Sequence, residues 1–173
     1  MAIGDLNQFI RDVPDFPKPG IVFKDISPLL KSPAGLAMAV EQMANPYRGM
    51  GVELVCGAES RGFIFGPAIA QQLNIGFVPV RKPGKLPAAT YQVSYDLEYG
   101  SDTLEVHQDA FTPGMKAVIV DDLIATGGTA AATAELVEQA GATVVGFSFL
   151  IELVDLKGRS LLPEVPVETL ISY

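Results

Sequence analysis

Four short apolar runs constrain this chain most, because they have the pattern of buried strands with helical patterns between them. The runs cover Leu54 to Cys56, Phe77 to Val80, Ala117 to Val120, and Thr143 to Leu150. Their apolar residues are successive rather than alternate, which is typical of parallel strands buried on both faces. Helical patterns occupy Gly62 to Leu73 and Thr129 to Ala140. This alternation predicts an α/β fold, with an open, mostly parallel, twisted sheet and helices on both faces.

The flanking segments fit one domain over residues 1–173, a length that suffices for a single core. Ser32 followed by a proline resembles a helix N-cap and predicts a helix from about Pro33 to Tyr47. A short helix is expected over Ile3 to Arg11. The three prolines of Val13 to Gly20 predict a stiff, irregular segment, because proline fixes φ and lacks an N–H group. Glu168 to Ser172 matches a final edge strand.

Composition and charge narrow the functional classes. Hydrophobic residues make up 49% of the chain and charged residues 18%, as in ordinary globular proteins. No apolar run approaches the ~18–20 residues that span a bilayer, so we expect no membrane association. The net charge of −8 argues against nucleic-acid binding, which requires a basic face. One cysteine, Cys56, and no signal peptide pattern at the start predict a cytoplasmic protein.

The stretch from Pro87 to Thr112 breaks the alternation and contains five acidic residues but no Lys or Arg. Its pattern around Tyr91 to Val106 indicates a polar hairpin. An excursion of this length from a compact domain is often functional, commonly a lid, here over about residues 82–112. One of its acids, Glu98, is discussed below. The others are expected to be solvated: Asp96, Asp102, Glu105 and Asp109.

The strongest motif is V-I-V-D-D-L-I-A-T-G-G-T, Val118 to Thr129, where an apolar strand ends in two acids and a small-residue loop opens a helix. Glycine tolerates positive φ and lets the backbone approach a ligand. The first N–H groups of a helix attract phosphate. Asp121 and Asp122, at the carboxyl end of the strand, can accept hydrogen bonds from sugar hydroxyls, where open α/β sheets bind ligands. The string is neither a Walker loop, which requires a lysine, nor a dinucleotide turn.

The whole string closely resembles the phosphoribosyl-pyrophosphate loop of type I phosphoribosyltransferases. That resemblance implies that the loop binds the 5′-phosphate and that Asp121 and Asp122 lie beside the ribose hydroxyls. The loop residues concerned are Ala125, Thr126, Gly127, Gly128 and Thr129.

Further segments resemble the adenine-specific members of that family. They are F-P-K-P-G-I-V-F-K-D-I-S-P-L-L at Phe16 to Leu30, G-A-E-S-R-G-F-I-F-G-P at Gly57 to Pro67, and G-F-V-P-V-R-K-P-G-K-L-P at Gly76 to Pro87, followed by L-E-Y-G at Leu97 to Gly100. The resemblance implies purine salvage: the phosphoribosyl group of phosphoribosyl pyrophosphate passes to adenine, giving AMP and pyrophosphate. It also implies an N-terminal hood, about residues 1–32, in which Val22, Phe23 and Lys24 line the adenine pocket.

The resemblance also assigns the pyrophosphate site and the acid–base residue. The pyrophosphate is held by a turn made of Glu59, Ser60 and Arg61. A peptide bond in this turn is expected to be strained, for example by a cis conformation. Arg61 is also expected to be catalytic, as a fork donor to phosphate oxygens. The compact basic cluster contributes further cations: Arg81, Lys82 and Lys85.

Glu98, on the lid, is the candidate acid–base residue. The matching glutamate of the family contacts N7 of the purine, where a carboxylate can accept or return a proton. Tyr99 is expected to pack or hydrogen-bond beside it. Lid closure would exclude water from the activated sugar.

Position 125 bears on the choice of base. Hypoxanthine and guanine enzymes usually have an aspartate there, used as a base near N7, whereas this chain has Ala125. Two alternatives stay open: a phosphoribosyltransferase for another purine such as xanthine, and a non-catalytic regulator that senses phosphoribosyl pyrophosphate and binds nucleic acid. The short, acidic chain and the presence of Glu98 disfavour the regulator.

The expected cofactor is Mg²⁺, which prefers oxygen ligands and bridges substrate phosphates. We expect the ion on pyrophosphate and the ribose hydroxyls, with Asp121 and Asp122 acting through the sugar or water and no dedicated protein cage. His107 is the only histidine, which leaves no histidine-based metal site or Ser-His triad. The family resemblance implies a homodimer.

Overall fold

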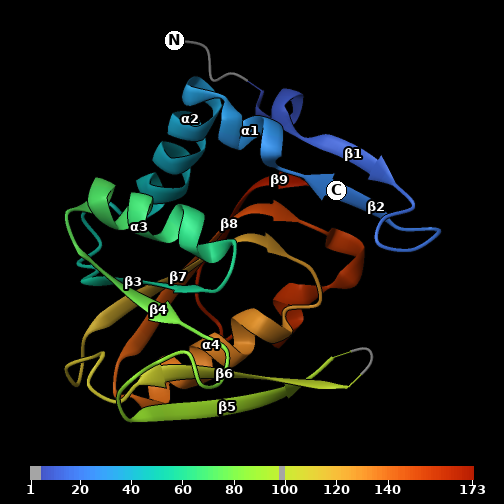
Figure 1. Ribbon diagram of the computed structural model, residues 1–173. Helices are drawn as coiled ribbons and strands as arrows, with labels where there is room; N and C mark the ends of the chain where they lie inside the picture. Colours follow the sequence, from blue (N-terminus) through green and yellow to red (C-terminus); the bar gives the residue numbers. More distant parts are fainter. Residues whose placement is uncertain (1–4, 98–99) are drawn as a thin grey trace.

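A five-stranded parallel sheet forms the centre of the molecule in the computed structural model, which describes residues 5–97 and 100–173 (Figure 1). Every neighbouring pair of its strands is parallel. In spatial order the strands are β4 (Gly76–Val80), β3 (Leu54–Ala58), β7 (Lys116–Ile124), β8 (Thr143–Glu152) and β9 (Val167–Ser172). The predicted fold class is confirmed.

Helices cover both faces of the sheet (Figure 1). One face carries α1 (Ser27–Lys31), α2 (Pro33–Ala44) and α3 (Gly62–Leu73), and the other carries α4 (Gly128–Gln139). Short 3₁₀ helices complete the chain at Leu6–Phe9, Asn45–Tyr47, Val154–Leu156 and Gly158–Leu161. The helices predicted at residues 33–47, 62–73 and 129–140 are all present, with ends that differ by three residues at most.

Two hydrophobic cores lie on opposite sides of the sheet. Met43 and Phe65 are fully buried in the core beneath α2 and α3. Leu136 and Phe147 are fully buried in the core beneath α4. The burial of successive residues in β7 and β8, on alternate faces, explains why these strands lack an alternating polar pattern.

The strand order reverses between β3 and β7. The chain passes from β3 through α3 to β4 on one side, and from β7 through α4 to β8 on the other. The loops that leave β3 and β7 therefore diverge to opposite faces at the carboxyl edge of the sheet. Such a switch point is where open α/β sheets leave room for a ligand.

The predicted hairpin at residues 91–106 is present as β5 (Thr90–Asp96) and β6 (Ser101–His107), paired antiparallel. Its polar pattern covers only one face. Val93, Leu104 and Val106 are buried on the α4 side and join the core there. The body of the hairpin is thus part of the packed domain.

The expectation of an irregular segment over Val13 to Gly20 was partly wrong. β1 (Arg11–Pro14) pairs antiparallel with β2 (Val22–Asp25), so Val13 and Pro14 belong to a strand. Proline is tolerated because this two-stranded ribbon has only edges. The turn between the strands contains Asp15 and Gly20 at positive φ, and the Asp15 carboxylate accepts the Gly20 N–H at 2.8 Å.

Candidate active site

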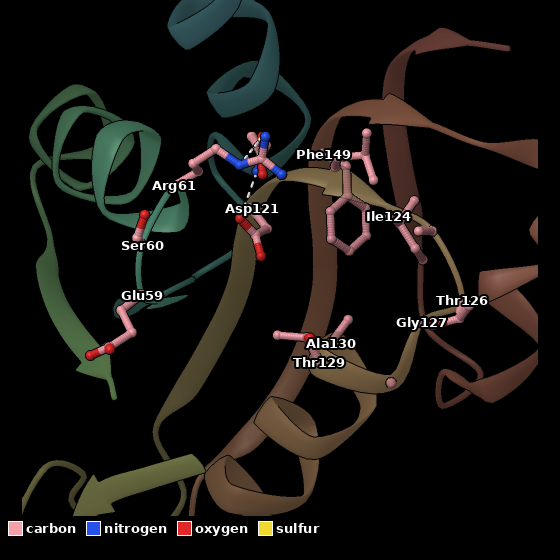
Figure 2. Close-up of a pocket in the computed structure, with 14 residues that line it drawn as sticks. Glu59, Ser60, Arg61, Asp121, Ile124, Thr126, Gly127, Thr129, Ala130 and Phe149 are labelled. Atoms are coloured by element: carbon pink, nitrogen blue, oxygen red, sulfur yellow. Dashed lines mark hydrogen bonds and ion pairs between the residues drawn. The ribbon is translucent and has the colours of Figure 1, made fainter. Parts of the chain in front are cut away.

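A pocket of about 290 Å³ opens at the switch point between β3 and β7 (Figure 2). It brings together three groups of predicted residues: the turn after β3, the acid pair of β7 and the small-residue loop before α4. Its lining residues are Glu59, Ser60, Arg61, Asp121, Asp122, Leu123, Ile124, Ala125, Thr126, Gly127, Gly128, Thr129, Ala130 and Phe149.

The predicted phosphate loop ends at the N-terminus of α4. Gly127 is the N-cap residue and has φ +86°, a conformation that L side chains rarely adopt. The cap is made without a side-chain hydrogen bond. The loop therefore presents the free N–H groups of the first turn and their partial positive charge, which suit an anion.

Two neighbouring segments hold this loop in place. A Cβ atom at Gly127 would lie 2.3 Å from the Gly158 carbonyl oxygen, and one at Gly158 would lie 2.4 Å from the Ala125 carbonyl oxygen. On the hairpin side, the Tyr95 hydroxyl lies 3.0 Å from the Thr129 hydroxyl. The loop is thus packed between the segment after β8 and strand β5.

The acids Asp121 and Asp122 lie within β7 rather than after it, which corrects the predicted end of this strand at Val120. Leu123 and Ile124 continue the ladder by pairing with β8. Asp121 Oδ1 accepts the backbone N–H of Asp122 at 2.8 Å. Burial raises the pKa of Asp121 well above its usual range, and the neighbouring Asp122 charge raises it further.

Arg61 reaches from the start of α3 toward the acid pair (Figure 2). Its Nε lies 2.9 Å from Asp122 Oδ2. This contact lacks hydrogen-bond geometry, so within the described residues the buried Oδ2 has no hydrogen-bond donor. Burial raises the pKa of Asp122, and the Arg61 charge opposes that increase. Asp122 thus retains a buried acceptor that a sugar hydroxyl could satisfy.

The turn after β3 has the backbone that the family resemblance implied: the peptide bond between Glu59 and Ser60 is cis. Glu59 accepts a 2.6 Å hydrogen bond from Arg81 Nε. Partial burial opposes ionisation of Glu59, but the hydrogen bonds from Arg81 and the Lys82 backbone, with the charges of Arg81 and Lys85, together lower the pKa of Glu59. Glu59 is therefore an anion that orients Arg81.

The basic cluster is only partly directed at the pocket. Lys82 Nζ forms a 2.5 Å ion pair with Asp102 on β6, and this hydrogen bond raises the pKa of Lys82 and lowers that of Asp102. Lys85 is exposed. The expectation that Asp102 and Glu105 are solvated charges was wrong: Asp102 is paired, and Glu105 is only 4% exposed.

The hood hairpin reaches the site at Phe23. The Phe23 ring centroid lies 5.5 Å from Arg61 Cζ, and Phe16 packs edge-on against Phe23. Lys24 instead donates to Asp12 at 2.7 Å and lies over the Tyr173 ring. Val22 is 49% exposed. None of the three predicted adenine residues lines the pocket itself.

Glu98 and Tyr99 lie outside the described residues. Four pocket residues were given no role from the sequence: Leu123 and Ile124, which lie within the motif, and Ala130 and Phe149, which lie outside it. Their apolar patterns indicated only core. Phe149, for example, reaches the pocket because the register of β8 places it opposite Asp121, a long-range pairing that local patterns do not encode.

The prediction of Mg²⁺ without a dedicated protein cage can be compared with the side chains that could bind a metal ion. In residues 5–97 and 100–173 no group of three or more His, Cys, Asp or Glu side chains could hold a metal ion. Asp121 and Asp122 nevertheless line the pocket, and hard oxygen donors suit Mg²⁺ carried by a substrate. Over the same residues, no helix has the length and apolarity to cross a membrane.

Comparisons with known proteins identify the family. A phosphoribosyl transferase domain model matches residues 31–165. The adenine phosphoribosyltransferase of Synechococcus sp. (strain JA-3-3Ab) is 63% identical over 164 residues, 94% of each chain.

Solved structures agree. The crystal structure of the adenine phosphoribosyltransferase from Thermoanaerobacter pseudethanolicus is 48% identical, with a TM-score of 0.95 over 99% of this chain and 100% of that one. The Saccharomyces cerevisiae enzyme, crystallised with adenine and an imino-altritol bisphosphate, is 43% identical, with a TM-score of 0.90 over 95% of this chain and 96% of that one. The chain therefore belongs to the adenine phosphoribosyltransferase family.

Proposed function

We propose that this chain transfers the 5-phosphoribosyl group from phosphoribosyl pyrophosphate to adenine, releasing AMP and pyrophosphate. The observation that carries the proposal is the meeting of an anion-binding loop, an acid pair and an arginine turn in one pocket at the strand switch point. Phosphoribosyl pyrophosphate carries a phosphate at one end of its ribose and pyrophosphate at the other. It therefore needs donors for both anionic ends and acceptors for the hydroxyls between them.

The 5′-phosphate is assigned to the loop from Ala125 to Thr129. Its support is the helix start at Gly128 and the backbone at Gly127, which leave N–H groups free for phosphate oxygens. Thr126 and Thr129 can add hydroxyl donors.

The ribose is assigned to Asp121 and Asp122, which can accept hydrogen bonds from its hydroxyls. Asp122 Oδ2 is supported by its burial without a donor. Its contact with Arg61 is an ion pair without hydrogen-bond geometry, so a sugar hydroxyl that donates to Oδ2 adds a hydrogen bond and gains affinity.

The pyrophosphate is assigned to two turns, residues 59–61 and 81–85. Arg61 lies across the pocket from the phosphate loop (Figure 2), so both ends of the substrate meet opposite charge. As the bond from C1 of the ribose to pyrophosphate breaks, negative charge grows on the leaving group. Arg61 and the cations Arg81, Lys82 and Lys85 stabilise that charge.

Mg²⁺ is proposed on the pyrophosphate and ribose hydroxyls, within reach of Asp121 and Asp122 through the sugar or water. When bound it neutralises phosphate charge. A homodimer and a cytoplasmic location are also proposed, on the family resemblance and on the single, buried Cys56, whose pKa burial raises to about 12.

Adenine is assigned to the hood, with Phe23 against the purine ring and Val22 and Lys24 beside it. The contact of Phe23 with Arg61 supports this, because it places the hood next to the pyrophosphate turn. The base must gain nucleophilicity at N9 as it bonds to C1 of the ribose. Glu98, with Tyr99 beside it, is proposed to exchange a proton at N7.

The test is to incubate the purified protein with phosphoribosyl pyrophosphate, Mg²⁺ and one base at a time: adenine, hypoxanthine, guanine, xanthine or orotate. Chromatography should detect AMP from adenine alone, and Glu98→Gln should lower kcat while leaving phosphoribosyl pyrophosphate affinity unchanged. Product from xanthine instead would contradict the assigned base. Tight binding of phosphoribosyl pyrophosphate without any product would indicate the regulator.

A further inference from the structure

Glu105 on β6 is a buried acid that the assigned roles do not use. It is 4% exposed, whereas Asp96 on β5 is exposed and Asp102 on β6 is half-buried. A buried carboxylate is costly unless it is hydrogen-bonded, so its partners indicate what it holds in place.

The backbone of Glu105 pairs with Arg81, the first residue of the basic turn. Arg81 N–H donates to the Glu105 carbonyl at 2.9 Å, and Glu105 N–H donates to the Arg81 carbonyl at 2.7 Å. This isolated antiparallel bridge joins the end of β4 to the hairpin. It fixes where the basic turn begins.

The side chain of Glu105 reaches the middle of the same turn. Oε2 accepts the backbone N–H of Gly84 at 3.2 Å, and Oε1 accepts Nε2 of Gln92, its partner across the hairpin. Both carboxylate oxygens therefore have donors. Gly84 has φ +75°, so the turn reverses at the residue that Glu105 holds.

The turn held in this way carries three cations. Arg81 bonds Glu59 in the pocket lining, Lys82 pairs with Asp102, and Lys85 follows Gly84 directly. Clustered cations repel one another, and a buried anion beneath them offsets that repulsion. A contiguous path of hydrogen bonds thus runs from Glu105 through Arg81 to Glu59.

We propose that Glu105 is a positioning residue for pyrophosphate, which shapes turn 81–85 so that its cations face the leaving group. The inference rests on the proposed role of this turn in binding pyrophosphate. Glu105 itself is buried behind the turn and acts through Arg81 and Gly84.

Glu105→Gln tests the proposal. A carboxylate accepts from both Gly84 and Gln92, whereas an amide has one accepting oxygen and would oppose one donor with another. We expect KM for pyrophosphate, measured in the reverse reaction from AMP, to rise roughly 5- to 20-fold. KM for adenine should stay unchanged, and the melting temperature is recorded for each variant.

The paired variant E105Q/Q92E provides a rescue. The amide introduced at position 105 can accept from Gly84 and donate to the carboxylate introduced at position 92, which restores both hydrogen bonds and the charge of the hairpin. We expect pyrophosphate KM to return to within about twofold of the original value. Recovery of the melting temperature without recovery of pyrophosphate KM would overturn the proposal.

Two further variants separate this inference from the proposed function. Asp109→Asn removes the same charge from an exposed position and should leave pyrophosphate KM unchanged. Lys85→Ala should raise it. A rise with Lys85→Ala but none with Glu105→Gln would overturn only the role of Glu105, whereas no rise with either would also refute the role of the basic turn.

Discussion

The proposed phosphate loop, which lines the pocket, and the hood, which meets the site where Phe23 faces Arg61, are built in opposite ways. The loop is packed between the backbone of Gly158 and the Tyr95 side chain of strand β5. The hairpin of the hood, β1 and β2, is a two-stranded ribbon with exposed residues, including Phe16 at 51% and Val22 at 49%. The difference teaches that the proposed phosphate site is preformed, whereas the proposed adenine site depends on a few side-chain contacts.

Two glycines with nearly the same backbone give the sharpest test of this comparison. Gly127 has φ +86° and Gly20 has φ +89°, but a Cβ at Gly127 meets the Gly158 carbonyl at 2.3 Å and one at Gly20 meets nothing within 4 Å. Gly127→Ala should cost roughly 1–2 kcal/mol for the backbone and about 1–3 kcal/mol for the overpacking. Gly20→Ala should cost only the roughly 1–2 kcal/mol for the backbone conformation.

Denaturant unfolding measures the free energy of unfolding for both variants, and titration calorimetry measures phosphoribosyl pyrophosphate affinity. Gly127→Ala should lose most of that affinity, because the loop must shift away from Gly158. Gly20→Ala should retain it. Equal losses in the two variants would refute the idea that packing, rather than backbone conformation, sets the anion site.

The acid pair should show a conflict between stability and binding. Because the pKa of Asp121 is raised above 3.8 in the folded chain, the folded state keeps this proton to higher pH than the unfolded state. The free energy of unfolding therefore falls as pH rises from about 4 through the raised pKa. Asp121→Asn should remove that fall, so the variant gains stability relative to the parent as pH increases.

The same variant should lose about 1.5–3 kcal/mol of phosphoribosyl pyrophosphate binding, because an amide is a weaker acceptor for ribose hydroxyls. Melting temperatures at pH 5 and pH 8, with calorimetric affinities, check both effects. Asp109→Asn, an exposed change of equal charge, is the control. If Asp121→Asn were less stable than the parent at pH 8, the interactions of the Asp121 carboxylate would contribute more to the free energy of unfolding than its burial costs.

The parts of the structure that were predicted from the sequence are those set by local patterns. The parts that were missed depend on packing between distant segments. The sheet, its helices and the loop at residues 125–129 were predicted because period, β-branching and glycine act locally. The ribbon at residues 11–25 was missed because its prolines masked a strand pattern. Gly158, Glu105 and Phe149 were missed as site components because each reaches the site by packing between distant segments.

Substitutions in the hood are expected to have the smallest effects on substrate binding. They also test whether the proposed adenine site and the proposed phosphate site act independently. Phe23 is partly buried, packs edge-on against Phe16 at 5.2 Å between ring centroids, and faces Arg61. Phe23→Ala should raise KM for adenine by an amount equivalent to about 1–3 kcal/mol, the value of stacking one base on an aromatic ring. The loss of the contact with Arg61 should weaken phosphoribosyl pyrophosphate binding by only about 0.5–1 kcal/mol.

Steady-state kinetics with each substrate varied in turn separates these effects, and Ile21→Ala, an exposed change in the same hairpin, is the control. Phe23→Leu retains apolar volume without a ring. Its KM for adenine should match that of Phe23→Ala if stacking on the ring sets the affinity, and that of the parent if burial of apolar volume sets it. A loss of phosphoribosyl pyrophosphate affinity as large as the loss for adenine would mean that Phe23 positions Arg61. The hood would then be part of the preformed anion site, and the distinction between the two sides of the pocket would fail at this residue.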